Sequence, residues 1–417
     1  MISGQIRKVC VVGLGYIGLP TAAVLASRGV EVIGLEVNET VIETINKGDI
    51  HIVEPGLDVI VKLAVSTKKL RATKEATPAD VFLIAVPTPF KGDHKPDLQY
   101  VESATRAIAK VLKRGDLVVL ESTSPVGTTE QIAAWLAEER GDLSFAKEGE
   151  EHCDVYIAYC PERVLPGQVL RELIENSRVI GGVNLSSAKS AQKFYQIFVQ
   201  GDCVITSARL AEMTKLAENS FRDVNIAFAN ELSLLCDQFG INVWELVALA
   251  NRHPRVNILQ PGCGVGGHCI AVDPWFLVSA APEKARVIRT AREVNNYKQE
   301  WVVKQIQNAA KDFFVQHGRG ANIVCYGLAF KPNIDDLRES PALEVYHDLR
   351  ELGLPVSAVE PNISEHNNVM LVDLERSIEQ ADILVFLVKH KEFAGIEVPH
   401  GKVALDFCGV HAISSPK

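Results

Sequence analysis

Residues 8–18 have the sequence KVCVVGLGYIG, in which a short β-rich apolar run is followed directly by Gly13, Gly15 and Gly18. A stretch with helical character then continues to Ser27. The spacing G-x-G-x-x-G between a strand and a helix is typical of a dinucleotide-binding turn, because the backbone approaches the pyrophosphate and the helix N-terminus faces the anion. The stretch therefore predicts a domain of the Rossmann type.

A second apolar run, Val30–Leu35, ends at Glu36, eighteen positions after Gly18. A carboxylate at this place in the fold bonds to the ribose hydroxyls of NAD and repels the 2′-phosphate of NADP. We therefore expect NAD to be the cofactor.

Further apolar runs at 81–86, 117–120 and 155–159 alternate with helical segments. This alternation indicates a parallel sheet with helices on both faces, in which ligands bind at the carboxyl ends of the strands. Thr88 and Thr123 follow two of these runs, so each is a candidate for a contact with cofactor or water. A plain turn role suits a threonine beside a proline equally well.

Glu162 and Arg163 follow the run at 155–159 and point to a substrate. Downstream, Lys215, Asn219 and Arg222 lie at i, i+4 and i+7 in a proline-free stretch, 208–239, that predicts a helix. All three side chains would leave the same face, which suits an anionic ligand rich in hydroxyls. A solvated helix face is the alternative.

Residues 262–269 have the sequence GCGVGGHC and are followed by Asp273. Glycines let a backbone approach a ligand closely, and a thiolate can add to an aldehyde to give an adduct that is oxidised further. We therefore predict that Cys269 is a catalytic nucleophile, while Cys263 is structural. Zinc binding by Cys263, His268 and Cys269 is not favoured, since no second pair of ligands completes a tetrahedral set.

A long helix is predicted from about 283 to 314, with arginines at three-residue spacing that suit a surface or an interface. A new α/β unit with apolar runs at 322–327, 355–359, 383–388 and 402–406 follows it. Lys331, just after the first of these runs, could meet a phosphate. The predicted fold is α/β, with two Rossmann-like parallel-sheet domains, 1–207 and 318–417, joined by a helical central segment, 208–317, that contains the cysteine loop.

The chain of 417 residues has 47% hydrophobic and 23% charged residues and a net charge of −9. The acidic balance without a long basic tract argues against a nucleic-acid partner. No run of about eighteen apolar residues is present, so no membrane span is expected. We expect a cytoplasmic protein with reduced cysteines.

Taken together, these residues resemble the UDP-glucose/GDP-mannose dehydrogenase family over essentially the whole chain. The similar blocks, in the family's order, are 12–20, 85–90, 121–128, 159–167, 218–231, 264–273 and 327–340. Within the family, residues 251–257 and 264–276 are similar to the branch that acts on 2-acetamido sugars. The resemblance implies a four-electron oxidation of the C6 hydroxyl of a UDP-sugar, with two NAD and one water, by a homodimer that serves surface polysaccharide synthesis.

The resemblance also implies residue roles. Cys269 would hold the thiohemiacetal and then the thioester, Lys215 and Asn219 would stabilise the oxyanion, and Asp273 and Glu162 would lie near the acid/base or hydrolytic steps. The expected contacts with the UDP-sugar are Arg163, Val164, Lys215, Asn219, Arg222, Gly266, Phe330 and Lys331, with His253 and Arg255 supplied by the partner subunit. The expected contacts with NAD are Gly13, Gly15, Tyr16, Ile17, Gly18, Glu36, Thr88, Thr123 and Arg338.

The chain departs from the family pattern at Cys263, where proline is common, and at residues 406–411, which lack the usual lysine. The sequence leaves the C2 epimer of the sugar open. A β-hydroxyacid dehydrogenase would share the first domain but need no thiol, and a non-catalytic nucleotide-sugar sensor would have no use for Cys269, Lys215 and Asp273.

Overall fold

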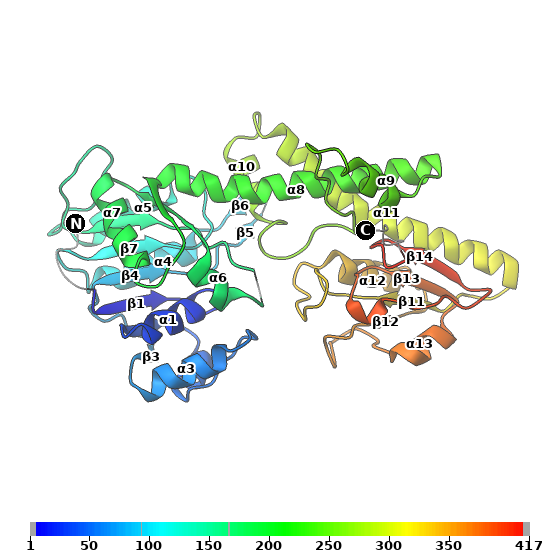
Figure 1. Ribbon diagram of the computed structural model, residues 1–417, viewed down its shortest axis with the longest axis horizontal. Coiled ribbons are helices and arrows are strands. Elements are labelled where there is room, and N and C mark those ends of the chain that lie inside the picture. Colours follow the sequence, from blue (N-terminus) through cyan, green and yellow to red (C-terminus); the bar gives the residue numbers. More distant parts are fainter. Residues whose placement is uncertain (1–5, 93, 166, 412–417) are drawn as a thin grey trace. The chain divides into compact units, whose positions relative to one another are not determined.

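The computed structural model describes residues 6–92, 94–165 and 167–411. The chain divides into two compact units, Met1–Ala217 and Glu218–Lys417. Each unit has a sheet of its own (Figure 1). The expected division into three parts, at residues 207 and 317, stays a prediction. Within the described ranges, no helix is both long and apolar enough to cross a membrane.

The first unit is built on an eight-stranded sheet in the order β10-β9-β8-β7-β4-β1-β2-β3. Its strands pair in parallel, as in the register of Val9 opposite Val32, except that β9 is antiparallel to β8. The predicted parallel sheet is therefore confirmed, with one reversed junction. The strands are β1 (Lys8–Val12), β2 (Glu31–Leu35), β3 (Leu70–Thr73), β4 (Val81–Ile84), β7 (Leu117–Leu120), β8 (Tyr156–Tyr159), β9 (Arg178–Gly182) and β10 (Cys203–Ser207).

Helices connect these strands, and side-chain caps mark where several of them begin. Asn38, for example, accepts from the backbone N–H groups of Thr40 and Val41 and so starts the second helix. A two-stranded hairpin of β5 (Phe90–Lys91) and β6 (Lys95–Pro96) follows β4. The helices are α1 (Gly18–Ser27), α2 (Glu39–Asn46), α3 (Leu57–Ser66), α4 (Gln99–Ala109), α5 (Thr128–Glu139), α6 (Val169–Glu175) and α7 (Leu185–Tyr195).

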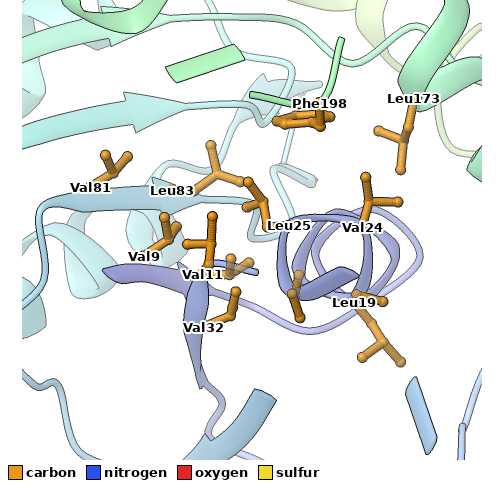
Figure 2. Close-up of a cluster of buried hydrophobic side chains, with 14 of the residues drawn as sticks. Val9, Val11, Leu19, Val24, Leu25, Val32, Val81, Leu83, Leu173 and Phe198 are labelled. Carbon is orange, nitrogen blue, oxygen red and sulfur yellow. The ribbon is translucent and has the colours of Figure 1, made fainter. Parts of the chain in front are cut away.

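The core of the first unit lies on both faces of the sheet, because side chains alternate along a strand. Val9 and Val11 of β1 belong to the cluster that includes residues of α1, α3 and α7. Figure 2 shows part of this cluster, with Leu25 of α1 near the valines. Cys10 and Val12 point the other way, into the cluster with α4 and α5. This two-sided burial explains why the strand is apolar at every position from Val9 to Val12.

Helix α8 (Ala208–Phe239) confirms the predicted long helix, and the division between the units falls within it. The second unit contains its C-terminal part, two shorter helices and a second long helix, which begins three residues later than expected. These are α9 (Val243–Ala250), α10 (Asp273–Ala280) and α11 (Arg286–His317).

The second sheet has four parallel strands in the order β12-β11-β13-β14. The four predicted strands are all present, as β11 (Ile323–Tyr326), β12 (Val356–Val359), β13 (Ile383–Phe386) and β14 (Val403–Asp406). The remaining helices are α12 (Pro341–Glu351), α13 (Leu374–Gln380) and the 3₁₀ turn η1 (Lys391–Phe393).

Candidate active site

The glycine turn of the first unit has the geometry that a pyrophosphate requires. Gly13 has φ +88°, and a Cβ there would lie 2.6 Å from the Ala85 carbonyl oxygen. A Cβ on Gly18 would lie only 1.8 Å from the Gly13 carbonyl oxygen. Gly15, in contrast, has open space where a Cβ would stand, and Ile17 gives α1 no side-chain cap. The turn therefore fits a dinucleotide at the N-terminus of α1.

Glu36 lies at the carboxyl end of β2, directly beside this turn. Its carboxylate accepts hydrogen bonds from the backbone N–H groups of Leu14 (3.0 Å), Val37 (2.8 Å) and Asn38 (3.1 Å). A carboxylate offers about four lone-pair positions, so these bonds fix its direction and still leave room for a ribose hydroxyl.

The two threonines that were candidates for cofactor contacts lie together at the ends of β4 and β7. The Thr88 hydroxyl donates to the Thr123 carbonyl oxygen at 2.6 Å. The Thr88 hydroxyl thus connects two loops, and a contact of either threonine with the cofactor stays a prediction. Tyr16, in the glycine turn, is exposed.

Glu162 is buried and lies between two cations of the first unit. Its carboxylate pairs with Arg178 at 2.6 Å, and its carbonyl oxygen accepts a 2.8 Å hydrogen bond from the Lys215 ammonium. Lys215 is itself buried, which excludes the solvated-face reading of this lysine. The structure therefore joins two of the predicted catalytic residues through the backbone of Glu162.

A second buried carboxylate, Glu121, lies at the end of β7. Its Oε1 accepts from the Tyr195 hydroxyl at 2.7 Å. Burial, together with the nearby charge of Glu162, raises the pKa of Glu121 to about 8. Sequence reasoning overlooked Glu121, Arg178 and Tyr195, although an arginine that opens the apolar run at 178–183 is a detectable sign of a buried charge.

The two predicted substrate contacts after Glu162 differ in their surroundings. The Arg163 guanidinium donates to the Ser177 carbonyl oxygen at 2.6 Å. The Val164 side chain packs against the core cluster of the first unit. A ligand contact at Val164 would therefore come from its backbone.

In the second unit, the α8 residue Asn219 is buried and its amide donates to the Asp273 carboxylate. Asp273 is the first residue of α10, and its backbone N–H donates to the Cys269 carbonyl oxygen at 2.8 Å. Cys269 is exposed, at the start of the turn that leads into α10. Asn219 and Asp273 thus contact each other through their side chains, while Cys269 is joined to Asp273 through the backbone of the turn before α10.

The glycines before Cys269 are required for packing within the second unit. A Cβ on Gly266 would lie 2.2 Å from the Glu339 carbonyl oxygen, and one on Gly267 would lie 2.9 Å from the Phe330 ring. These glycines therefore allow the loop to pack closely against the chain's own backbone at Glu339 and against the Phe330 ring.

Cys263 lies at the other end of this loop and is 5% exposed. Burial raises the pKa of its thiol to about 12, so it remains protonated and unreactive near neutral pH. Among the described residues, no group of three or more His, Cys, Asp and Glu side chains is placed to hold a metal ion.

The other predicted ligand contacts of the second unit are at or near its surface. Arg338 is exposed and forms an ion pair with Asp336 at 2.6 Å, while Lys331 is half-buried. Arg222 on α8 and the two residues expected to serve a partner subunit, His253 and Arg255, are exposed.

Comparison with known proteins gives three family matches along the chain. Residues 7–199 match the NAD-binding domain of the UDP-glucose/GDP-mannose dehydrogenase family, residues 209–297 its central domain, and residues 324–411 its UDP-binding domain.

Individual relatives match along nearly the full length. The chain is 60% identical to a UDP-N-acetyl-D-mannosamine dehydrogenase of Campylobacter jejuni, covering 97% of this chain and 100% of that protein. It is 58% identical to an NDP-N-acetyl-D-galactosaminuronic acid dehydrogenase of Ralstonia solanacearum, covering 97% and 96%. The solved structure of a UDP-D-ManNAc dehydrogenase from Pyrococcus horikoshii superimposes with a TM-score of 0.88 at 41% identity, covering 98% and 97%.

Proposed function

This chain belongs to the UDP-glucose/GDP-mannose dehydrogenase family, and we propose that it oxidises the C6 hydroxyl of UDP-N-acetyl-D-mannosamine to a carboxylate with two NAD and one water. The observation that carries the proposal is the hydrogen bond between the buried Asn219 amide and the Asp273 carboxylate, at a residue whose backbone N–H donates to the carbonyl oxygen of the exposed Cys269. The 60% identity to a relative named for this substrate supports the choice of sugar.

NAD fits the first unit, where Gly13, Gly15, Gly18 and the start of α1 would hold the pyrophosphate and Glu36 the ribose. When bound, NAD supplies the acceptor for the two hydrides that leave C6. The charge of Glu36 disfavours the 2′-phosphate of NADP.

The thiol explains how one enzyme can oxidise the C6 alcohol first to an aldehyde and then to a carboxylate. The Cys269 sulfur adds to the C6 aldehyde, and its proton is transferred to the aldehyde oxygen, giving a thiohemiacetal. Loss of a hydride and a proton converts this adduct into a thioester. Water then adds to the thioester carbon, and the C–S bond breaks to release the carboxylate and restore the thiol.

The polar residues assist where charge develops. An oxyanion forms at the C6 oxygen during addition and hydrolysis, and hydrogen-bond donors stabilise such a charge, a role that we assign to the Lys215 ammonium and the Asn219 amide. Asp273 orients the Asn219 amide through their hydrogen bond. Glu162 holds Lys215 by its carbonyl oxygen and, with Asp273, is a candidate to take a proton from water.

The substrate is tested by turnover of UDP-N-acetyl-mannosamine, -glucosamine and -galactosamine at equal concentrations, followed by NADH absorbance. We expect two NADH per sugar, with the highest kcat/KM for the mannosamine compound. One NADH per sugar would show that no thioester is formed and would contradict the mechanism. Parallel assays with NADP, where we expect little turnover, test the role of Glu36.

A second substrate has a specific observation in its favour. A relative of almost the same identity, 58%, is named for N-acetyl-D-galactosaminuronic acid. The residues described above do not depend on the configuration of the sugar, so UDP-N-acetyl-galactosamine is the alternative, with UDP-N-acetyl-glucosamine third. A higher kcat/KM for the galactosamine or the glucosamine compound in the same assays would make that compound the proposed substrate instead.

We further propose that the enzyme acts as a homodimer in the cytoplasm. Phe221, Phe228 and Leu235 lie seven residues apart on α8 and are 68%, 52% and 42% exposed in the single chain. An exposed apolar stripe at heptad spacing is typical of a helix that packs against another helix. Cys10, Cys160, Cys236, Cys263 and Cys325 are buried free thiols, as expected in a reducing compartment.

A further inference from the structure

A cavity of about 330 Å³ lies in the second unit, apart from the residues of the proposed chemistry. The end of α8, the start of α9, the middle of α11 and the end of β14 surround it, and Asp237, Trp244, Lys298 and Trp301 are among the lining residues. Its volume lies within the range of pockets that bind small molecules.

Lys298 is the unusual residue of this cavity. The residue is only 2% exposed. Its ammonium donates a hydrogen bond to the Ser233 hydroxyl at 2.7 Å and lies 3.8 Å from the centre of the Trp301 ring. Within the described residues, no carboxylate pairs with it at 4 Å or less. A buried ammonium without a counter-charge is destabilising.

The titration of Lys298 reflects this environment. Burial lowers the pKa of Lys298 to about 7, while the nearby Asp237 acts in the opposite direction. An anion that entered the cavity would stabilise the charged form of the amine. The neighbouring Asp406 carboxylate does not act as the counter-charge of Lys298. It accepts hydrogen bonds from the backbone N–H groups of Cys408, Gly409 and His411 instead.

We propose that this cavity binds a small organic carboxylate, whose anionic group pairs with Lys298 and whose body packs against the indole rings of Trp244 and Trp301. A monoanion is favoured over a phosphate, because the cavity offers one ammonium and no arginine, and Asp237 repels additional negative charge. The aromatic walls suit a flat or apolar body.

The test uses benzoate as the probe and calorimetric titration of the full-length protein as the measurement. We expect benzoate to bind, benzamide to bind about tenfold more weakly or not at all, and the Lys298→Met variant to lose benzoate affinity by about tenfold or more, as for loss of a charged partner. Lys304→Met, which removes an exposed lysine of the same helix, is the control and should bind benzoate like the wild type.

A second measurement needs no variant. The affinity of the wild type for benzoate should fall as the pH rises from 6 to 9, because Lys298 loses its proton. The other charged or titratable groups around the cavity are Asp237 and Cys236 on α8, Asp406 on β14, the buried thiol of Cys263 beside Lys298 and His411 beside Asp406. Absence of benzoate binding, affinity that is unchanged in Lys298→Met, or affinity that is constant with pH would each overturn the proposal.

Discussion

At the scale of single residues, two carboxyl groups are buried close to each other in the first unit. Glu121 and Glu162 are both buried near one guanidinium, that of Arg178, which pairs with Glu162. Burial and the nearby charge of Glu162 raise the pKa of Glu121 and so favour its protonated form. The Arg178 guanidinium is then paired with the Glu162 carboxylate, and the Glu162 carbonyl oxygen accepts the hydrogen bond from Lys215.

The protonation of Glu121 predicts a dependence of stability on pH. Its pKa is about 8 in the folded chain against an ordinary 4.5, so between these values the folded state keeps a proton that the unfolded state has lost. The free energy of unfolding should therefore fall as the pH rises through this window, by on the order of 1 kcal/mol per pH unit. Glu121→Gln should remove this contribution, so that the variant gains stability relative to the wild type toward pH 8.

Urea unfolding at several pH values between 5 and 8 measures this difference. Glu151→Gln, at an exposed position of the same unit, is the matched control and should follow the wild type. A constant difference between Glu121→Gln and the wild type across the window would show that Glu121 is ionised in the folded protein.

The two cysteines of the glycine loop give a second prediction. Cys269→Ser should reduce the formation of the second NADH by about a hundredfold or more, because a serine hydroxyl is scarcely ionised near neutral pH and is a far weaker nucleophile. Cys263→Ser is the control and should retain wild-type turnover, although it can lower stability, since Cys263 is buried in the core. The measurement is NADH released per UDP-sugar; an essential Cys263 with a dispensable Cys269 would reverse the assignment.

At the scale of elements, the two sheets repeat the same local device. Gly13 after β1 has φ +88° and donates its N–H to Leu35, while Gly327 after β11 has φ +89° and donates to Val359. In both sheets an acid follows the neighbouring strand, and its carboxylate accepts a hydrogen bond from the backbone N–H of the residue after the glycine. Glu36 accepts from Leu14 in this way, and Glu360 accepts from Leu328 at 2.7 Å. The second sheet thus has the turn of a dinucleotide fold without its glycine motif.

The glycine loop is also an element whose sequence is set by packing, which yields a third prediction. Gly266→Ala would place a Cβ 2.2 Å from the Glu339 carbonyl oxygen, so the loop must shift and displace Cys269. We expect kcat to fall by about tenfold or more, because small displacements of a reacting group are costly. Gly262→Ala, where the nearest atom to a Cβ is 3.9 Å away, should be tolerated. Equal kcat values for the two variants would contradict this account.

At the scale of the whole molecule, the exposed stripe of α8 predicts how copies of the chain associate. Phe228→Lys should weaken dimerisation, because it places a charge at the centre of an apolar contact. Light scattering coupled to gel filtration should show the mass of one chain at concentrations where the wild type has twice that mass. Val59→Lys, at a position of α3 that is 66% exposed, is the control and should remain dimeric. A monomeric wild type would refute the dimer.

The sequence by itself determined the strand, turn and helix units and the long α8, and it predicts that Cys269 is the reactive cysteine. These features depend on local preferences, such as the period of apolar residues and the freedom of Gly13, which act over a few neighbouring positions. Only the tertiary structure decided that β9 is reversed, that Arg178 pairs with Glu162, that Glu121 is buried beside them and that Phe330 underlies Gly267. Each of these features depends on contacts between segments that are distant in the sequence. The protonation of a carboxyl and the packing of a side chain there depend on burial by those segments, which the residue type alone does not reveal.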